Sequence, residues 1–600
     1  MSLNPTKISL FLGIFLLGLK PIGMGQDLNR YIPKDAFAVM SVNAQRYSEK
    51  VDMDKVLELE VFQSLDQQAQ KKMGDKYAVI SNIYKQPKEA GIDLFPKSYG
   101  YAELVDSLYM MSYVFKIADK AKFEDFLGQT IVPVSSEKKI LKGKGYHYVT
   151  QTSKGAMMVA WTDEAASFIF ADGESKGIRK GLSYDDPDYY DKLEERKKAF
   201  NQTKLKAIMG KAKRVKGIKG TGIASNPNYQ QFDKSPFDVG VWVDAEGFSE
   251  LIRRNAASEF SSPQKKNMAG VLSSMNEGYY YHIGMNFESG ALDLRSRTFV
   301  PADKFSDFAE MYQKRPNKEF FSYVNGNNII GLGSVAIDIK KTAANILETY
   351  VPMLNSIPEM ENRVDPTVRL LGIALDEDAL ANIFRGDLML NVSDFREVES
   401  TYIDYVYDEE YNKKKVEKTK KEMQPIITGM ASIGNQKHFN EIVKALKAYG
   451  VIAEDKKNQF KLAIPGAKIN PTFVVKDGLL IATNDNKLIE MLADGDDLRR
   501  RDRLSKDMQS QILENSQLFF IDLQRLMGKL LEDEKTPPEV RQNTEVLNEY
   551  FKHAKLTGID TENNYFEYDF RLSMKDEDTN AAMQLFMLAN EFFLLKGQGK

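Results

Sequence analysis

The chain has 600 residues, a formal net charge of −3 at pH 7 and no cysteine, and 42% of its residues are hydrophobic. The missing cysteine excludes disulfides, thiolate nucleophiles and thiolate metal sites. The mildly acidic balance argues against a general polyanion binder and against a nucleic-acid partner. A chain of this length and hydrophobicity can bury enough apolar surface for several domains.

Residues 1–25 have the order of a secretory signal peptide: the basic Lys7, an apolar run at 8–19, and small residues before Gln26. About 12 apolar residues span about 18 Å as a helix, against roughly 30 Å of bilayer hydrocarbon, which disfavours a permanent anchor. We therefore expect cleavage near Gly25, export of the chain, and no transmembrane segment after the signal is removed. The signal boundary carries no cysteine for lipid attachment.

Two sequence patterns recur in the same order, which predicts a duplicated architecture. The segments 155–173 and 478–495 each start with glycine and an apolar run, and each ends in Ala-Asp-Gly. The segments 284–297 and 558–571 each start with glycine, pass a turn-type sequence and end in arginine.

We place the first half at residues 30–312 and the second half at residues 313–596. The first half has extra residues at 174–236, and the second half has extra residues at about 393–425. Insertions in a duplicated scaffold are where we expect function.

Strand patterns in each half are followed by helical patterns. We predict strands at 32–43, 108–117, 237–244, 316–325, 426–433 and 518–522, and helices at 121–127, 248–254, 337–354, 438–446 and 526–531. Asp477-Gly478 predicts a two-residue hairpin turn, and Ser153-Lys-Gly155 predicts a weaker one. Strands joined by hairpins, without regular βαβ crossovers, predict an α+β fold of mostly antiparallel sheets with packed helices.

The sequence has no recognisable catalytic constellation. The four histidines, which are His147, His282, His438 and His553, are not spaced as metal ligands. The acidic clusters at 185–191, 404–410 and 494–497 lack the calcium-loop pattern. Serine-elbow, phosphate-loop and dinucleotide motifs are also missing. We therefore expect no cofactor, no bound metal and no enzymatic activity. The alternative is a hydrolase of envelope glycans or peptides that works through paired carboxylates.

A basic segment at residues 196–219 contains ten lysines or arginines and no acid. These residues are Arg196, Lys197, Lys198, Lys204, Lys206, Lys211, Lys213, Arg214, Lys216 and Lys219. Interleaved apolar residues favour an amphipathic segment that contacts an anionic surface such as lipid headgroups. The simpler alternative is a solvated helix that neutralises the acidic stretch at 185–191.

Two short motifs carry a family resemblance. The pattern Ile-Pro-x-Asp-Ala-Phe-Ala-Val-x-x-Val-Asn at 32–43, after the export signal, resembles the openings of a Bacteroidota family termed domain of unknown function 4836. The segment Ile-Phe-Arg-Gly-Asp-Leu-Met-Leu at 383–390 resembles the same family. Members of that family are mostly exported or lipid-anchored at the cell envelope. The resemblance implies no catalytic residues.

These observations together predict an exported, non-enzymatic protein of the periplasm or the outer-membrane surface. We expect it to act as a binding or assembly factor that contacts an envelope protein, a glycan or a lipid surface.

Overall fold

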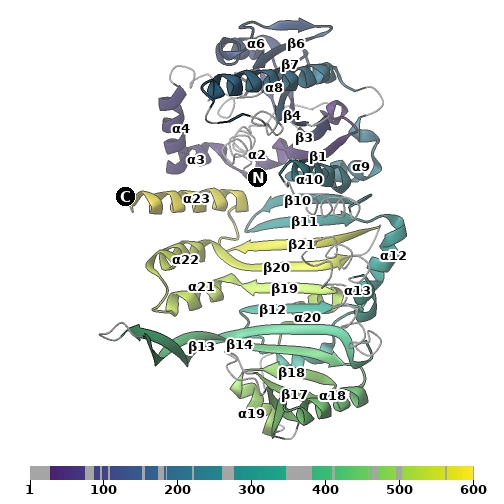
Figure 1. Cartoon of the computed structure of the whole chain (residues 1–600), viewed down its shortest axis with the longest axis vertical. Helices are drawn as coiled ribbons and strands as arrows, with labels where there is room; N and C mark the ends of the chain where they lie inside the picture. The colour runs from purple at the N-terminus through teal and green to yellow at the C-terminus, as the bar shows by residue number, and fades with distance from the viewer. Residues whose placement is uncertain are drawn as a thin grey trace. The chain divides into compact units, whose positions relative to one another are not determined.

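The fold comes from a computed structural model of the chain (Figure 1). The structure describes residues 28–73, 87–94, 97–105, 108–151, 156–172, 182–183, 186–218, 222–259, 276–345, 381–407, 413–456, 458–462, 471–494, 503–560 and 564–598. The predicted signal peptide and the Ser153–Gly155 turn lie outside these residues. The chain forms two compact units. Unit 1 comprises Met1–Pro301 with Asp576–Lys600, and unit 2 comprises most of residues 302–575.

Unit 1 contains an antiparallel sheet. In order of pairing, its strands are β11 (Ala291–Phe299), β10 (Tyr280–Glu288), β9 (Val239–Asp244), β1 (Ala36–Asn43), β3 (Lys97–Val105), β4 (Leu108–Ile117), β8 (Ala165–Asp172), β7 (Ala156–Trp161), β6 (Tyr146–Gln151) and β5 (Leu141–Gly143). The short β2 (Ile92–Asp93) also pairs with β4.

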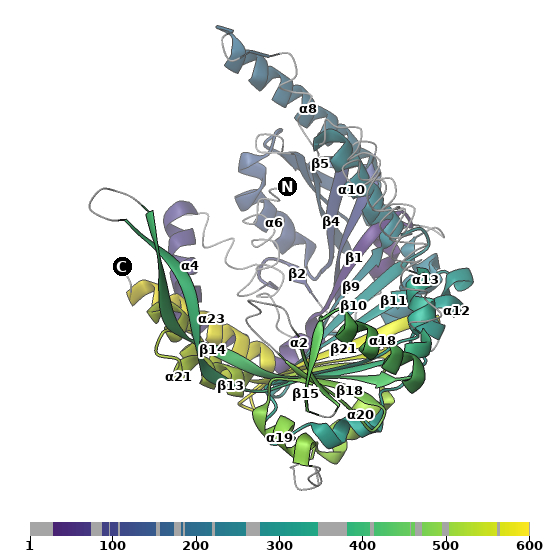
Figure 2. The same cartoon turned by 60° about the horizontal axis from the view of Figure 1, so that its bottom comes forward.

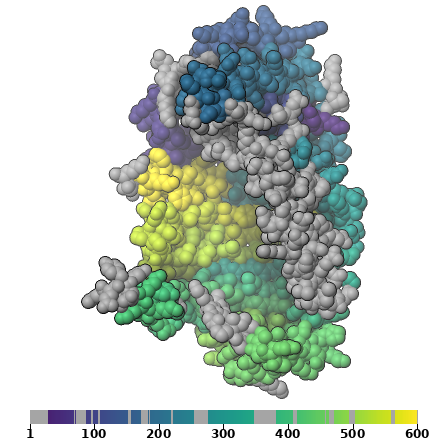
Figure 3. Space-filling view, in the orientation of Figure 1, coloured from purple at the N-terminus to yellow at the C-terminus, as the bar shows by residue number. Residues whose placement is uncertain are grey.

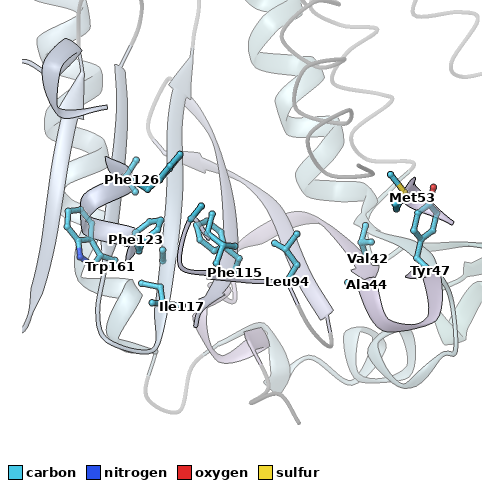
Figure 4. Close-up of a cluster of buried hydrophobic side chains, with 14 of the residues drawn as sticks. Val42, Ala44, Tyr47, Met53, Leu94, Phe115, Ile117, Phe123, Phe126 and Trp161 are labelled. Carbon is cyan, nitrogen blue, oxygen red and sulfur yellow. The ribbon is translucent and has the colours of Figure 1, made fainter. Parts of the chain in front are cut away.

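Successive residues of a strand point to opposite faces of a sheet. Both faces of this sheet carry apolar side chains, and helices cover both. Phe115 of β4 packs with Phe123 and Trp161 on one face (Figure 4), whereas the neighbouring Val114 packs with Trp242 on the other. The helices of unit 1 are η1 (Leu28–Tyr31), α2 (Ala44–Lys50), α3 (Met53–Glu58), α4 (Glu60–Met73), α6 (Lys120–Thr130), η2 (Val132–Val134), α8 (Tyr189–Lys211), η3 (Ala212–Lys216), η4 (Ile223–Ser225), α9 (Pro227–Lys234), α10 (Ala245–Glu259) and α23 (Ala581–Gln598).

Helix α23 ends the chain but belongs to unit 1. Ala582 joins the core around Phe115, and the Phe586 ring meets the Phe62 ring edge-on at 5.6 Å. Asn590 Oδ1 accepts a hydrogen bond from the Val61 backbone N–H. A unit built mainly from residues 1–301 therefore uses the last helix of the chain to complete its core.

Unit 2 also contains a set of antiparallel strands. Its strands, again in order of pairing, are β21 (Tyr565–Met574), β20 (Phe551–Asp560), β19 (Gln517–Asp522), β12 (Gly331–Ala336), β13 (Phe384–Tyr407), β14 (Lys413–Ile433), β18 (Leu479–Thr483), β17 (Thr472–Lys476), β16 (Gln459–Leu462) and β15 (Ile452–Lys456). Its helices are α12 (Ala302–Met311), η5 (Lys318–Tyr323), α13 (Ile339–Asn345), α18 (Gln436–Ala448), α19 (Asn486–Asp494), α20 (Lys506–Glu514), α21 (Leu523–Glu532) and α22 (Pro538–Tyr550).

The described strands follow the same order in both units once β2 is set aside. The first strand of each unit pairs with the next long strand on one side and with the eighth on the other: β1 with β3 and β9, and β12 with β13 and β19. Helix caps also correspond. Asn43 and Asp338 cap the helix after the first strand, and Asp119 and Asn435 cap the helix after the third. The halves at 30–312 and 313–596 stay a prediction, supported by this shared order.

The antiparallel sheets and packed helices confirm the predicted α+β class. The hairpin turn at Asp477-Gly478 forms between β17 and β18, with φ of 51° and 72° at its two residues, as a primed turn requires. The strand predicted at 316–325 was wrong. That segment forms the 3-10 helix η5, which begins where the Asn317 side chain accepts a hydrogen bond from Glu319 N–H.

The two predicted insertions have different structures. Residues 174–236 contain α8, η3, η4 and α9. The described residues of 393–425 extend β13 and β14 as one hairpin that pairs as far as Tyr407 and Lys413 (Figure 2). Tyr402, Ile403 and Tyr405 are exposed on this arm of unit 2.

Candidate anion-binding site

A cleft of about 900 Å³ in unit 1 lies between the turn that leads into β1 and the helix η3. Pro33, Lys34 and Asp35 line it from the turn, and Lys213, Arg214 and Lys216 line it from η3. Four of these six residues are cationic, and one is acidic.

Backbone hydrogen bonds hold the two walls of the cleft together. Ile218 N–H donates to the Arg30 carbonyl at 2.9 Å, and Ile223 N–H donates to the Ile32 carbonyl at 3.0 Å. Gly217 ends η3 with φ of 86°, a left-handed conformation that glycine adopts without a steric cost. The chain can therefore turn sharply after Lys216 and return along the η1 segment.

Glu103 is a buried carboxylate that lies beneath η3. It lies on β3 opposite Ala36, its side chain is completely buried, and it pairs with Arg214 and, at 3.4 Å, with Lys211. Burial lowers the pKa of Arg214, but the hydrogen bond and charge of Glu103 outweigh burial and raise that pKa overall. Arg214 therefore stays charged, and η3 is anchored to the sheet through a buried carboxylate.

The lysines around the cleft have no comparable partner. Lys34, Lys213 and Lys216 are exposed. Lys216 Nζ donates to the Lys144 carbonyl at 3.1 Å, which leaves its charge uncompensated. In the described part of the chain, no carboxylate forms an ion pair with Lys34 or Lys213. Asp35 is the single acid among the described residues of its walls, so the cleft has an excess of positive charge there, which favours an anionic group.

The structure divides the ten basic residues predicted as one surface. Lys213, Arg214 and Lys216 line the cleft, and Lys211 is held by Glu103. Lys204 is buried, with its ammonium 4.5 Å from the centre of the Phe200 ring. Of the ten basic residues, those exposed on α8 are Arg196, Lys197, Lys198 and Lys206. The space-filling view shows α8 at the surface of unit 1 (Figure 3). Lys219 lies outside the described residues.

Sequence reasoning missed Lys34, Asp35 and Glu103. Lys34 and Asp35 fall at the start of the predicted strand at 32–43, where charged residues are ordinary, whereas the structure places them in the turn before β1. The one clue to Glu103 is an acid at position 103 within the apolar segment 101–105. A completely buried carboxylate needs a cationic partner, but the sequence does not say which one.

Two of the histidines, His282 and His147, pack against aromatic rings. His282 is buried, and its ring lies 4.2 Å from the Phe299 ring and 5.6 Å from the Phe232 ring. Burial, aided by the nearby Arg297, lowers the pKa of His282 to about 3. His147 stacks on Trp161. Among the described residues, no three histidine, aspartate or glutamate side chains gather where they could hold a metal ion.

In the same residues, no helix combines the length and the apolar character needed to span a membrane. A comparison with curated proteins gave no match to the chain. The comparison with family models did give one, and it covers much of unit 1, including the turn into β1 and the whole of β3. Residues 29–179 match the family described as "Domain of unknown function (DUF4836)", which confirms over that range the resemblance seen in the sequence.

Proposed function

We propose that this is an exported, non-enzymatic binding protein of the cell envelope, and that its cleft in unit 1 binds a phosphate-bearing ligand. The observation that carries the proposal is the placement of Lys34, Lys213 and Lys216 around a cleft of about 900 Å³. Export rests on the signal-peptide pattern of residues 1–25.

Three features support an anion as the ligand. The exposed lysines come from two separate segments, so both walls are basic. Glu103 neutralises Lys211 and Arg214, whereas Lys34 and Lys213 form no ion pair with a described carboxylate, so their ammonium groups can contact a ligand. A volume of about 900 Å³ also lies within the range of small-molecule sites.

A phosphate group could come from a lipid headgroup or from a soluble phosphorylated glycan. Residues 26–600 would be mixed with phosphatidylcholine vesicles, with vesicles that also contain phosphatidylglycerol, and with glucose 1-phosphate. Sedimentation would measure vesicle binding, and calorimetry would measure binding of the sugar phosphate. Binding to the mixed vesicles alone identifies a lipid surface, and binding to glucose 1-phosphate identifies a soluble ligand.

The test variant is Lys34→Ala with Lys213→Ala. A lysine near an anionic surface contributes about 1 kcal/mol, so losing two should weaken binding about 30-fold. The matched control is Lys198→Ala with Lys206→Ala, which removes two exposed lysines of α8 outside the cleft. Equal losses in both double variants would show that the basic segment acts as a whole. No loss in the cleft variant would refute the proposed site.

A further inference from the structure

A second, smaller pocket lies in unit 2, and its lining differs from that of the basic cleft. It has a volume of about 260 Å³. Its lining is rich in amide and hydroxyl groups, among them those of Asn325, Asn328, Asn391, Ser393 and Thr428. A pocket below the size usual for drug-like ligands suits a single small ring.

Asn391 is the residue that points to a ligand. It lies on β13, is only 2% exposed, and its Oδ1 atom has no hydrogen-bond partner among the described residues. Buried acceptors are nearly always paired, because an unpaired one loses its hydrogen bonds with water without replacement. Arg396 also lines the pocket, and its buried Nε donor has no acceptor among the described residues. Two residues of the pocket lining therefore carry one acceptor and one donor that no described protein group uses.

Rigid strands hold these groups in place. Asn391 pairs in register with Thr428 of β14, and the pair two residues along the sheet, Met389 and Met430, lies in the core of unit 2. The Thr428 and Thr483 hydroxyls lie 2.8 Å apart, and Thr483 donates to the Ile427 carbonyl at 3.0 Å. A preformed polar row of this kind lets a ligand bind without ordering a loop.

The charged residues of the pocket balance one another. Its lining contains Asp394 and Asp485, which are acidic, and Arg396 and Lys487, which are basic. Asp394 forms an ion pair with Lys529 at 3.3 Å, and Asp485 accepts hydrogen bonds from the first backbone N–H groups of α19. The two acids and two bases give the lining no net formal charge, which favours a neutral ligand with several hydroxyl groups over an anion or a cation.

We propose that this pocket binds one ring of a neutral sugar. One sugar hydroxyl donates to Asn391, and another sugar hydroxyl accepts from Arg396. Each hydroxyl can donate and accept a hydrogen bond, so one ring can serve both residues. The inference is independent of the basic cleft, since the two sites share no residues.

The test uses residues 26–600 and four neutral sugars: glucose, galactose, mannose and N-acetylglucosamine. Saturation-transfer NMR and calorimetry should show saturable binding of at least one of them in the millimolar range. The Asn391→Leu variant removes the unpaired acceptor and should weaken that binding about tenfold or more, while thermal unfolding occurs at the same temperature or higher. Arg396→Met should weaken binding as well.

The control is Asn548→Leu on α22, because Asn548 also has a buried, unpaired Oδ1 but does not line the pocket. It should leave sugar binding unchanged. The Lys34→Ala, Lys213→Ala variant should also bind the sugar normally, so failure at the basic cleft would be seen separately. The absence of saturable binding for all four sugars would show that the pocket holds only water and would overturn the proposal. Equal losses in Asn391→Leu and Asn548→Leu would overturn it too.

Discussion

The substitution Glu103→Gln gives the sharpest test of how unit 1 holds its cleft. It keeps the shape of the side chain and removes the charge from a carboxylate that is completely buried. Arg214 and Lys211 then lose their partner, while their side chains are only 16% and 23% exposed. The substitution should therefore destabilise unit 1.

The expected loss follows from the burial of the three groups. Removing one partner of a buried ion pair costs about 3–5 kcal/mol, because the remaining charge stays poorly solvated. Both cations here keep some contact with water, so we expect the lower end, about 3 kcal/mol. The variant should also bind phosphate-bearing ligands more tightly than the native protein, because the Arg214 charge is no longer neutralised. Stability and binding thus change in opposite directions.

Tryptophan fluorescence isolates this effect. The chain has two tryptophans, Trp161 and Trp242, and both are buried in unit 1. A denaturant titration followed by fluorescence therefore reports unit 1, whereas circular dichroism reports both units. Glu103→Gln should shift the fluorescence transition to lower denaturant.

The control for this experiment is a double-mutant cycle with Arg214→Gln. Because the two residues interact, the double variant should lose less stability than the sum of the single variants. A loss below about 1 kcal/mol in Glu103→Gln would mean that the buried carboxylate does not hold the cations, and the account of the cleft would fail.

Two further predictions use the same tryptophan signal. Phe586→Ala, near the end of the chain, should destabilise unit 1 by about 2 kcal/mol because its packing on Phe62 is lost. The control Phe566→Ala, whose ring packs on Phe305 in unit 2, should leave the fluorescence transition in place. The opposite pattern would contradict the assignment of α23 to unit 1. Because burial lowers the pKa of His282 to about 3 in the folded state, the unfolded state binds a proton at higher pH than the folded state does. The free energy of unfolding of unit 1 should therefore fall by about 2 kcal/mol between pH 7 and pH 5. His282→Leu should remove that part of the pH dependence, and an unchanged slope would show that His282 is not the titrating group.

Local features of the fold could be predicted because they depend on neighbouring residues. The alternation of apolar and polar residues predicted strands such as β4 and β9, and Asp477-Gly478 predicted its hairpin turn. The same reasoning gave the wrong structure for 316–325, where Asn317 starts a 3-10 helix and the apolar residues are buried in a different geometry. Periodicity over so short a segment does not separate these two forms.

The sequence by itself determined the α+β class, several of the strands and helices, and the presence of a basic segment, because periodicity, turn residues and composition act over a few positions. Only the tertiary structure decided which basic residues line the cleft. Packing of η3 on the strands brings Arg214 onto Glu103, 111 positions earlier in the chain, and β13 buries Asn391 with no partner for its acceptor among the described residues. Contacts of this kind depend on which strands lie side by side, and burial then determines which charges need a partner.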